Sequence, residues 1–256
     1  MKIPSLLAAL ILVSATQGQE TPAPATTTPA APTTPATPPT PPKPKTGLFA
    51  YKPPKSAGTV ERKDGDGASR AKITLSNGAT MILPDLYVLT PKQGVALTTK
   101  AQPSLFTYQT AMCPVEYRVT IMEPGQPEAA FIYAVSRTAT GVHRVDLSEF
   151  DVNLKPGVEY KWVVVFRPEP ASPSKDLEAN GRIMRVNPDP ALAEKLKTAA
   201  PDELAAVYAE AGIWYDALAA ISDQIAANPG DKDLQAMRTN LLKQVNLDAA
   251  AAAKQK

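Results

Sequence analysis

The chain has 256 residues and a formal net charge of +2, from 27 basic and 25 acidic side chains. This near balance gives no reason to expect a nucleic-acid partner or an anionic membrane as partner. Because Cys113 is the single cysteine, an internal disulfide is excluded, and the fold must be stabilised by packing.

The first residues have the layout of a cleaved secretory signal peptide. The basic Lys2 precedes an apolar run over residues 6–13, and the small residues Ala15 and Gly18 follow it. This run is shorter than the ~20 residues that a membrane helix needs, and no longer apolar run comes after it. We expect residues 1–18 to be removed and the mature chain, without a transmembrane segment, to be exported to the periplasm, the cell surface or the medium.

A proline- and threonine-rich segment follows. Residues 20–46 contain ten prolines and nine threonines and nothing more apolar than alanine. Such a composition favours extended polyproline II at ~3.1 Å per residue, which gives a reach on the order of 80 Å. We expect a disordered stalk over residues 19–69, either a spacer that lifts the domain off a surface or a linker without a specific role. Residues 64–67 resemble the start of a calcium loop but lack its remaining acidic positions, so we interpret them as a turn.

A period of two begins at Lys72 and predicts a sheet region over residues 70–187. Residues 115–121 alternate apolar and polar side chains, which indicates a half-buried strand. Residues 160–166 are apolar on both faces, so we predict a central strand there. Many short strands, separated by turn signals, predict an antiparallel β-sandwich. The other predicted strands are residues 72–75, 86–89, 95–99, 105–108, 131–135, 142–147 and 182–186.

One motif sharpens this prediction. Residues 154–162 match the pattern L-x-P-G-x-x-Y-x-W, which resembles a corner of fibronectin type III and related immunoglobulin-like domains. The resemblance implies that the Tyr160 hydroxyl bonds back to the backbone of the preceding corner. Trp162, two positions further on, then faces the same way and belongs to the core. The alternative for Trp162 is a ligand-stacking role.

From about Arg185 the apolar period changes to 3.6, which predicts a helical module over residues 188–248. Asp189 followed by Pro190 is a helix start, with a capping side chain and proline at the first helical position. A second helix opens at residues 200–203 and ends at Gly212. A third runs to the stop at residues 228–230. Leu234, Met237, Leu241 and Val245 form the stripe of a fourth helix, and the tail 249–256 is expected to be disordered.

The second and third of these helices resemble a single tetratricopeptide repeat, with Gln224 as the departing position. An isolated repeat cannot bury its own apolar face, so it must pack on the fourth helix and the sandwich or dock a partner protein. For docking, the candidate contacts are Tyr208, Trp214 and Tyr215. Tyr215 is off the apolar stripe, so we expect it to be exposed, as interface tyrosines often are. The positions that match the repeat are Leu204, Tyr208, Gly212, Trp214, Ala217 and Pro229.

Several segments together resemble a family of secreted bacterial proteins, common in cyanobacteria, that is known as domain of unknown function 928. The resemblance spans about residues 84–247, and its most specific part is the stretch AEAGIWYDAL at residues 209–218. It implies one recurring unit of a sandwich followed by helices, and it implies no activity or binding residue. The matching segments are residues 86–91, 97–99, 102–103, 156–162 and 204–217.

The residues that carry chemistry are sparse. His143 is the single histidine, and Asp146, three positions along the same predicted strand, points to the opposite face. One histidine and one cysteine cannot make a zinc site by themselves. We expect Cys113 to be buried, the alternative being an oxidisable thiol. Nothing places acidic pairs such as Asp146 and Glu149 across a cleft, so we predict no catalytic, metal or cofactor residue and no enzyme.

The sequence therefore predicts an α+β protein, an antiparallel immunoglobulin-like β-sandwich followed by a tetratricopeptide-like helical module. We expect it to act in protein–protein interaction or structural support, with an envelope protein as partner. The alternative is a module that binds carbohydrate or a cell-wall polymer through the sandwich. That alternative needs a cluster of exposed aromatic side chains on one sheet.

Overall fold

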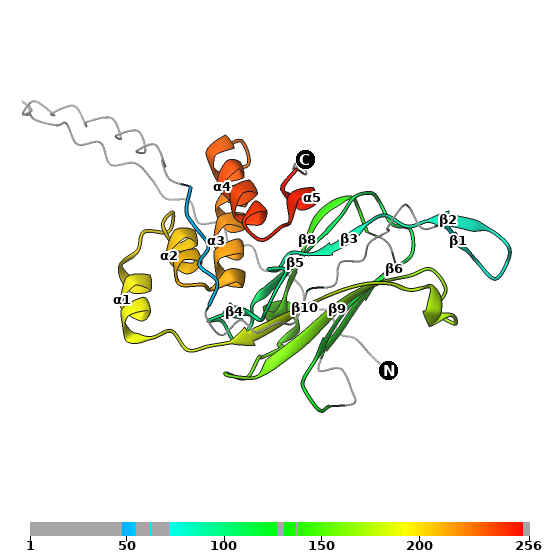
Figure 1. The fold of residues 1–256 in the computed structure, drawn as a ribbon, viewed down its shortest axis with the longest axis horizontal. Coiled ribbons are helices and arrows are strands. Elements are labelled where there is room, and N and C mark those ends of the chain that lie inside the picture. Colours follow the sequence, from blue (N-terminus) through cyan, green and yellow to red (C-terminus); the bar gives the residue numbers. More distant parts are fainter. Residues whose placement is uncertain (1–47, 55–61, 63–71, 127–130, 137, 253–256) are drawn as a thin grey trace, which may run out of the picture. The chain divides into compact units, whose positions relative to one another are not determined.

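A computed structural model describes residues 48–54, 62, 72–126, 131–136 and 138–252. The predicted signal peptide, the proline-threonine segment 20–46 and the calcium-like residues 64–67 lie outside the described residues. The described part of the chain is of mixed α+β class, as predicted, with antiparallel strand pairs followed by helices (Figure 1).

The strands form two larger sheets and a separate hairpin. One sheet has the order β4-β10-β9-β6-β7, the second has the order β3-β5-β8, and β1 pairs with β2. The central position predicted for residues 160–166 is confirmed, because β9 lies between β10 and β6. The strands are β1 (Lys72–Thr74), β2 (Thr80–Ile82), β3 (Leu86–Val88), β4 (Ala96–Thr98), β5 (Ser104–Gln109), β6 (Glu116–Met122), β7 (Phe131–Val135), β8 (Gly141–Asp146), β9 (Glu159–Arg167) and β10 (Leu177–Arg185).

The purely antiparallel arrangement that we expected has one exception. β4 runs parallel to β10, with Ala96 opposite Ile183, whereas the other strand pairs are antiparallel. Turn signals report on hairpins between consecutive strands, and β4 and β10 are joined through most of the domain. Parallel pairing needs such a long connection, so no local pattern could predict it.

The two larger sheets share one core. On β6 the side chains of Tyr117, Val119 and Ile121 are buried, and they alternate with half-buried polar ones, which is the pattern of a strand with one face covered. The Tyr117 hydroxyl lies 2.9 Å from Thr107 Oγ1 of β5 in the other sheet. This buried hydrogen bond places the inner faces of the two sheets against each other.

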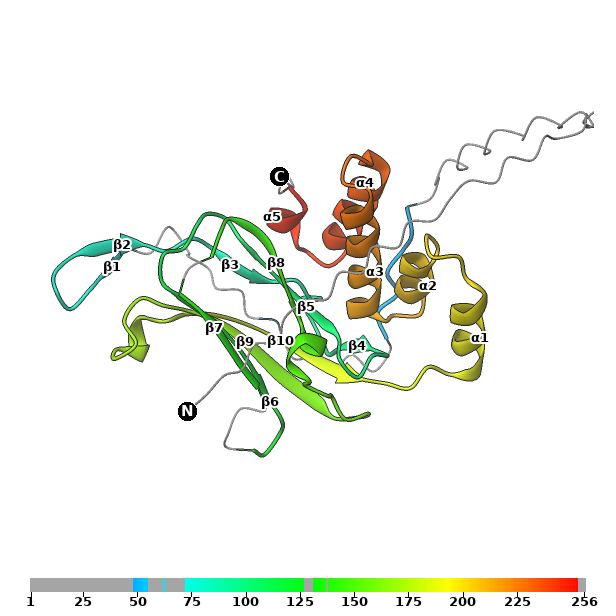
Figure 2. The same ribbon diagram turned by 180° about the vertical axis from the view of Figure 1, so that it is seen from behind.

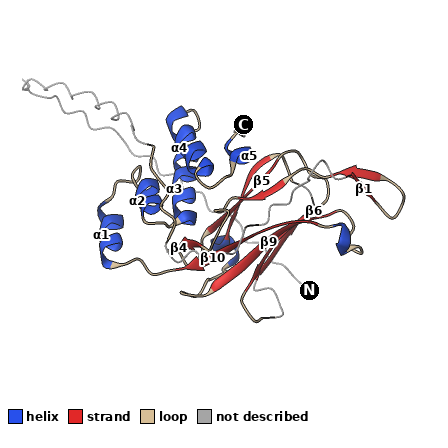
Figure 3. Ribbon diagram, in the orientation of Figure 1, coloured by secondary structure: helices blue, strands red, loops and turns tan. Residues whose placement is uncertain are grey.

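The C-terminal part contains five α-helices (Figures 2 and 3). Asp189 caps the first of them, since its carboxylate accepts a hydrogen bond from Leu192 N at 2.7 Å. No helix of the described residues is long and apolar enough to cross a membrane. The helices are α1 (Pro190–Thr198), α2 (Leu204–Glu210), α3 (Trp214–Ala227), α4 (Lys232–Lys243) and α5 (Asp248–Ala251).

The predicted disordered tail starts too early. α5 covers part of residues 249–256, and its Ala250 and Ala251 are buried. The alanines give no periodic signal in the sequence, but they fit closely against the core. Residues 253–256 lie outside the described part.

The predicted disordered stalk also extends too far. Residues 48–54, which we call the strap, run alongside α2 and α3 (Figures 1 and 2). Phe49 and Tyr51 are buried, whereas Ala50 and Lys52, which alternate with them, are exposed, as in an extended strand with one face covered. These two rings make the strap unlike the preceding Pro/Thr segment, because they offer enough apolar surface to offset the entropy of ordering. Arg62 is likewise buried, with its guanidinium donating to Thr90 O at 2.6 Å.

The closest approach of the strap to the helices occurs at Gly212. This glycine has a left-handed φ of 76°, and a Cβ built on it would lie 2.6 Å from Lys52 O of the strap. Both the conformation and the close approach require glycine here.

Gly212→Ala is therefore expected to destabilise the protein by about 1–2 kcal/mol from the left-handed conformation alone, with a further loss from displacing the strap. The free energy of unfolding in urea measures the effect. Gly230→Ala is the matched control, since Gly230 has open space around its Cβ position and no left-handed φ. Equal losses in the two variants would contradict the assigned role of Gly212.

Candidate functional site

The predicted partner-contact residues do not form a surface. Trp214 and Tyr215 are both 0% exposed, and Tyr208 is half-buried. The expectation that Tyr215 is exposed is wrong, because a second buried face of α3 points at the two sheets and Tyr215 lies on that face. The sequence left two roles open for the helices, packing within the chain and docking of a partner protein. The side chains of Trp214 and Tyr215 serve the first.

The Tyr215 hydroxyl connects α3 to the core of the five-stranded sheet. It accepts a hydrogen bond from Trp162 Nε1 of β9 at 2.7 Å. It lies within hydrogen-bonding distance of Arg182 O, at 3.2 Å, and Thr90 Oγ1, at 3.3 Å, either of which can receive its proton. Donor and acceptor capacity are both used, as a fully buried hydroxyl requires.

Trp214 and Asp216, on either side of Tyr215, make the neighbouring contacts. Trp214 Nε1 donates to Leu89 O at 2.8 Å. The Asp216 carboxylate is 1% exposed and accepts from Thr98 Oγ1 at 2.6 Å and from Thr99 N at 2.9 Å. A buried carboxylate is tolerated when donors surround it. Three consecutive residues of α3 therefore fasten the helices to the strands.

The absence of a side chain at Gly181 of β10 makes space for the hydrogen bonds of Tyr215. A Cβ at this position would lie 2.7 Å from Thr90 Cγ2 and 3.1 Å from Trp162 Nε1. Glycine thus lets Thr90 and the Trp162 indole come together beside Tyr215.

A second bridge lies further along α3. The Arg144 guanidinium of β8 forms ion pairs with Asp146 and with Asp223 of α3, and it lies 5.6 Å from the centroid of the Phe106 ring. Asp223 is more than half exposed, so this bridge contributes less than the buried contacts of Tyr215.

The corner motif has the geometry that its resemblance implies. The Tyr160 hydroxyl accepts a hydrogen bond from Lys155 N at 3.2 Å, and the Trp162 side chain is 0% exposed. Because Trp162 is covered and bonded to Tyr215, a ligand cannot stack on it.

The chemically reactive residues are not brought together. His143 lies on the inner face of β8, with its ring 6.0 Å from that of Tyr117 and Nε2 2.7 Å from Ala139 O. Asp146 instead binds Ser104 and Arg144. Cys113 is buried, and burial raises the pKa of its thiol. Within the described ranges, no three His, Cys, Asp or Glu side chains are close enough to hold a metal ion.

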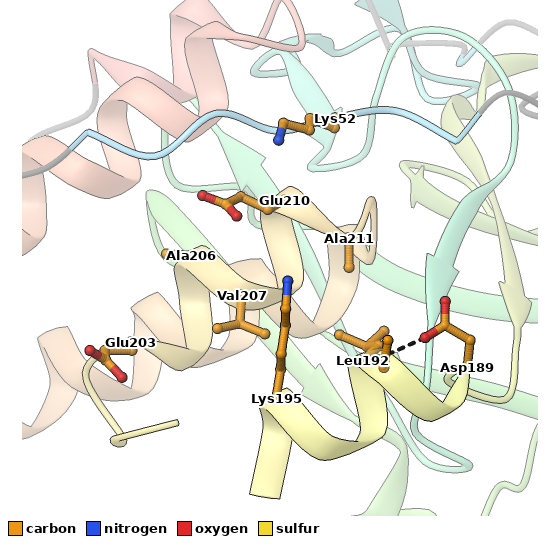
Figure 4. Close-up of a pocket in the computed structure, with 10 residues that line it drawn as sticks. Lys52, Asp189, Leu192, Lys195, Glu203, Ala206, Val207, Glu210 and Ala211 are labelled. Carbon is orange, nitrogen blue, oxygen red and sulfur yellow. Dashed lines mark hydrogen bonds between the residues drawn. The ribbon is translucent and has the colours of Figure 1, made fainter. Parts of the chain in front are cut away.

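A cleft of about 600 Å³ lies between α1, α2 and the strap (Figure 4). Sequence reasoning missed it, because its walls come from three separate segments. Its apolar surface is supplied by Leu192 and Val207, together with small alanines, and its rim carries both charges. Lys52 reaches it from the strap, Lys195 from α1 and Glu210 from α2. Two carboxylates that line the cleft already accept hydrogen bonds from backbone amides. Asp189 accepts from Leu192 N, and Glu203 accepts from Ala200 N. The lining residues are Lys52, Asp189, Ala191, Leu192, Lys195, Glu203, Ala206, Val207, Glu210 and Ala211.

α1 is the helix with the weakest attachment. None of its residues is buried, whereas each of the other helices buries at least two. Leu192 and Leu196 are half-buried, and Leu192 lines the cleft. Part of the apolar surface of α1 and α2 therefore faces the cleft.

Tyr215→Phe is expected to destabilise the protein by about 1–3 kcal/mol, because Trp162 Nε1 loses its buried acceptor. Denaturation in urea measures the change. Tyr108→Phe is the matched control, since Tyr108 is a half-buried tyrosine of β5 whose ring stacks on Tyr87. If the two variants lose the same stability, the Tyr215 hydroxyl does not fasten α3 to the sheets.

The same hydroxyl predicts a loss of stability in alkali. Burial raises the pKa of Tyr215 above its ordinary value, and the bonds to Thr90 and Trp162 oppose this only in part. The protonated form is favoured in the folded state, so its contribution is complete below pH of about 10 and is lost as the pH rises further. Tyr215→Phe should make the fall of unfolding free energy above pH of about 10 shallower by up to ~1.4 kcal/mol per pH unit. An unchanged slope would contradict the burial of an ionisable group here.

Comparison with protein families gives a match over most of the chain. The family model described as Domain of Unknown Function (DUF928) matches residues 65–255, and a search of curated proteins finds no match. The matched segment includes both larger sheets and all five α-helices, and it begins beyond the strap. The AEAGIWYDAL stretch that suggested this family is the segment that supplies Trp214, Tyr215 and Asp216. Since the match covers more than half of the chain, the protein belongs to the DUF928 family.

Proposed function

We propose that this protein is exported to the cell envelope and acts there by binding another protein, without catalysing a reaction. The observation that carries the proposal is the cleft between α1 and α2, with apolar surface and a rim of both charges. Its size and mixed lining suit an extended segment of an envelope protein, with small apolar side chains directed at Leu192 and Val207 and polar groups facing Lys195 and Glu210. The signal-like residues 1–18 support export.

The scaffold of this site is, in our proposal, an immunoglobulin-like sandwich. Support comes from the two sheets around one core, from the parallel edge pair β4 and β10, and from the Tyr160 corner. Such a scaffold holds the helices through rigid strands, so that the cleft has a defined position.

The helices are, in the same proposal, a tetratricopeptide-like pair formed by α2 and α3. Gln224, which departs from the pattern of the repeat, donates through Nε2 to Pro201 O at 3.0 Å. It thereby ties α3 to the segment that precedes α2. With Trp214 and Tyr215 committed to the sheets, the outer side of α2 toward α1 is what this pair can offer to a partner.

The test is capture of the partner in the native host. Tagged protein is crosslinked in intact cells and purified, and the wild type is compared with Ala206→Arg, which places a long cation in the cleft. Ala226→Arg is the matched control, because Ala226 is an exposed alanine of α3 outside the cleft lining. A protein that is lost with Ala206→Arg and retained with Ala226→Arg is the expected result, with both variants folded by circular dichroism.

The competing outcome is binding of cell-wall polysaccharide. Of the large apolar side chains that are exposed in the described part of the chain, only Phe150 is aromatic, and its ring lies 5.4 Å from that of Tyr133. The cluster of exposed aromatics that this function needs is therefore not assembled there. Polysaccharide that co-purifies equally with the wild type and both variants, without a cleft-dependent protein, would overturn the proposal.

A further inference from the structure

The strap is held by the helices in the way that a protein holds an extended peptide. The side-chain amide of Gln244, which follows α4, forms two hydrogen bonds with the backbone of the strap. Its Oε1 accepts from Tyr51 N at 2.7 Å, and its Nε2 donates to Phe49 O at 3.0 Å. Lys52 N donates to Ala209 O at the end of α2, at 3.0 Å. Backbone pairing of this kind gives affinity, and the side chains at alternate positions give specificity.

The aromatic rings of Phe49 and Tyr51 in the strap are buried in the hydrophobic core. Phe49 and Tyr51 are 8% and 9% exposed, and the Tyr51 ring meets that of Trp214 edge to face, with centroids 5.0 Å apart. An edge-to-face pair adds to the free energy gained by burial. The missing Cβ of Gly212 leaves the space that Lys52 O uses. We call this surface, formed by Ala209, Gly212, Trp214 and Gln244, the strap groove.

The strap groove does not depend on the strap for its shape. Trp214, its floor, is fixed by the hydrogen bond to Leu89 O, and Tyr215 and Asp216 hold the start of α3 to the strands. Asn240 Oδ1 accepts a second hydrogen bond from Gln244 Nε2, at 2.7 Å, which orients the amide from within the helix. A groove built by the rest of the fold is preorganised for its occupant.

The groove and the strap are also far apart in the chain. The bonds of Gln244 to Tyr51 and Phe49 span 193 and 195 residues. The strap contacts therefore do not result from the geometry of neighbouring residues in the chain. They are contacts between the groove and a distant segment. A segment of the same sequence supplied as a separate molecule can make every one of them.

We propose that the strap groove is a peptide-binding site, and that residues 48–54 are its resident, displaceable ligand. The ligand class is an extended peptide with aromatic side chains at alternate positions, Phe-x-Tyr, followed by Lys-Pro-Pro. Occupancy sets Lys52 at the rim of the α1–α2 cleft. The inference is distinct from the proposed docking in that cleft, since Ala209, Gly212, Trp214 and Gln244 do not line the cleft and the peptide experiment reports on them alone.

The experiment uses the full chain and a synthetic fluorescent peptide of residues 46–54. The receptor is the Phe49→Ala/Tyr51→Ala variant, in which the resident strap is weakened. Its affinity for the peptide, from fluorescence anisotropy, is expected to exceed that of the wild type by about tenfold or more, because the cis strap no longer competes. A peptide with alanine in place of Phe49 and Tyr51 should not bind.

The matched pair of groove variants locates the binding. Gln244→Ala in the strap-weakened chain should lower the affinity by about tenfold, since two backbone hydrogen bonds are lost. The control is Gln235→Ala, which replaces a glutamine of α4 whose Nε2 donates to Pro229 O, and it should leave the affinity unchanged. Equal affinities of Gln244→Ala and Gln235→Ala, or no binding to the strap-weakened chain, would overturn the proposal.

Hydrogen exchange gives a second readout that needs no strap substitution. In the wild type the amides of Tyr51 and Lys52 should exchange slowly, because both are hydrogen-bonded to the helices. Gln244→Ala should accelerate their exchange by about tenfold, and Gln235→Ala should not. Exchange at the rate of an unfolded chain in the wild type would show that the strap groove holds no resident ligand.

Discussion

Tyr215 places its hydroxyl between the indole of Trp162 on β9 and Arg182 O on β10, in a region without exposure to solvent. A hydroxyl in such surroundings must keep its hydrogen bonds, because an unpaired buried donor or acceptor costs more than the bond itself contributes. α3 can therefore satisfy Tyr215 in one position on the sheets. Trp214 and Asp216 follow from that position, with their bonds to Leu89 O and to Thr98 and Thr99.

This constraint explains where binding surfaces can occur. Trp214, Tyr215 and Asp216, in the middle of the stretch that resembles the family, have their side chains buried inside the domain. What remains available are surfaces that depend on the docked helices without forming the contact itself. The cleft beside α1 is one, and the strap groove above Trp214 is the other. The strap groove includes Trp214 at the start of α3, and the cleft is lined by α2, which packs on α3, so both surfaces depend on how α3 is held by the sheets.

Local signals predicted a large part of the fold. The alternation in β6, the two-sided apolar run of β9 and the cap of Asp189 on α1 each depend on neighbours within a few residues, and each is present in the structure. The parallel pairing of β4 with β10 was missed because partners so distant in the chain leave no local pattern. The strap was missed because Phe49 and Tyr51 stand within a segment whose composition is dominated by proline and threonine further upstream.

The sequence by itself determined the kind of protein: an α+β chain of the DUF928 family, with strands before helices and a signal-like start. These properties follow from composition, apolar period and motif, which are written along the chain. The tertiary structure decided the environment of each aromatic side chain. Tyr215 lies off the helical stripe, so periodicity assigned it to solvent, and the sheets cover it because a helix packed on two surfaces buries more than one face. Burial on a second face depends on an element that is distant in sequence, and for that reason only the folded chain reveals it.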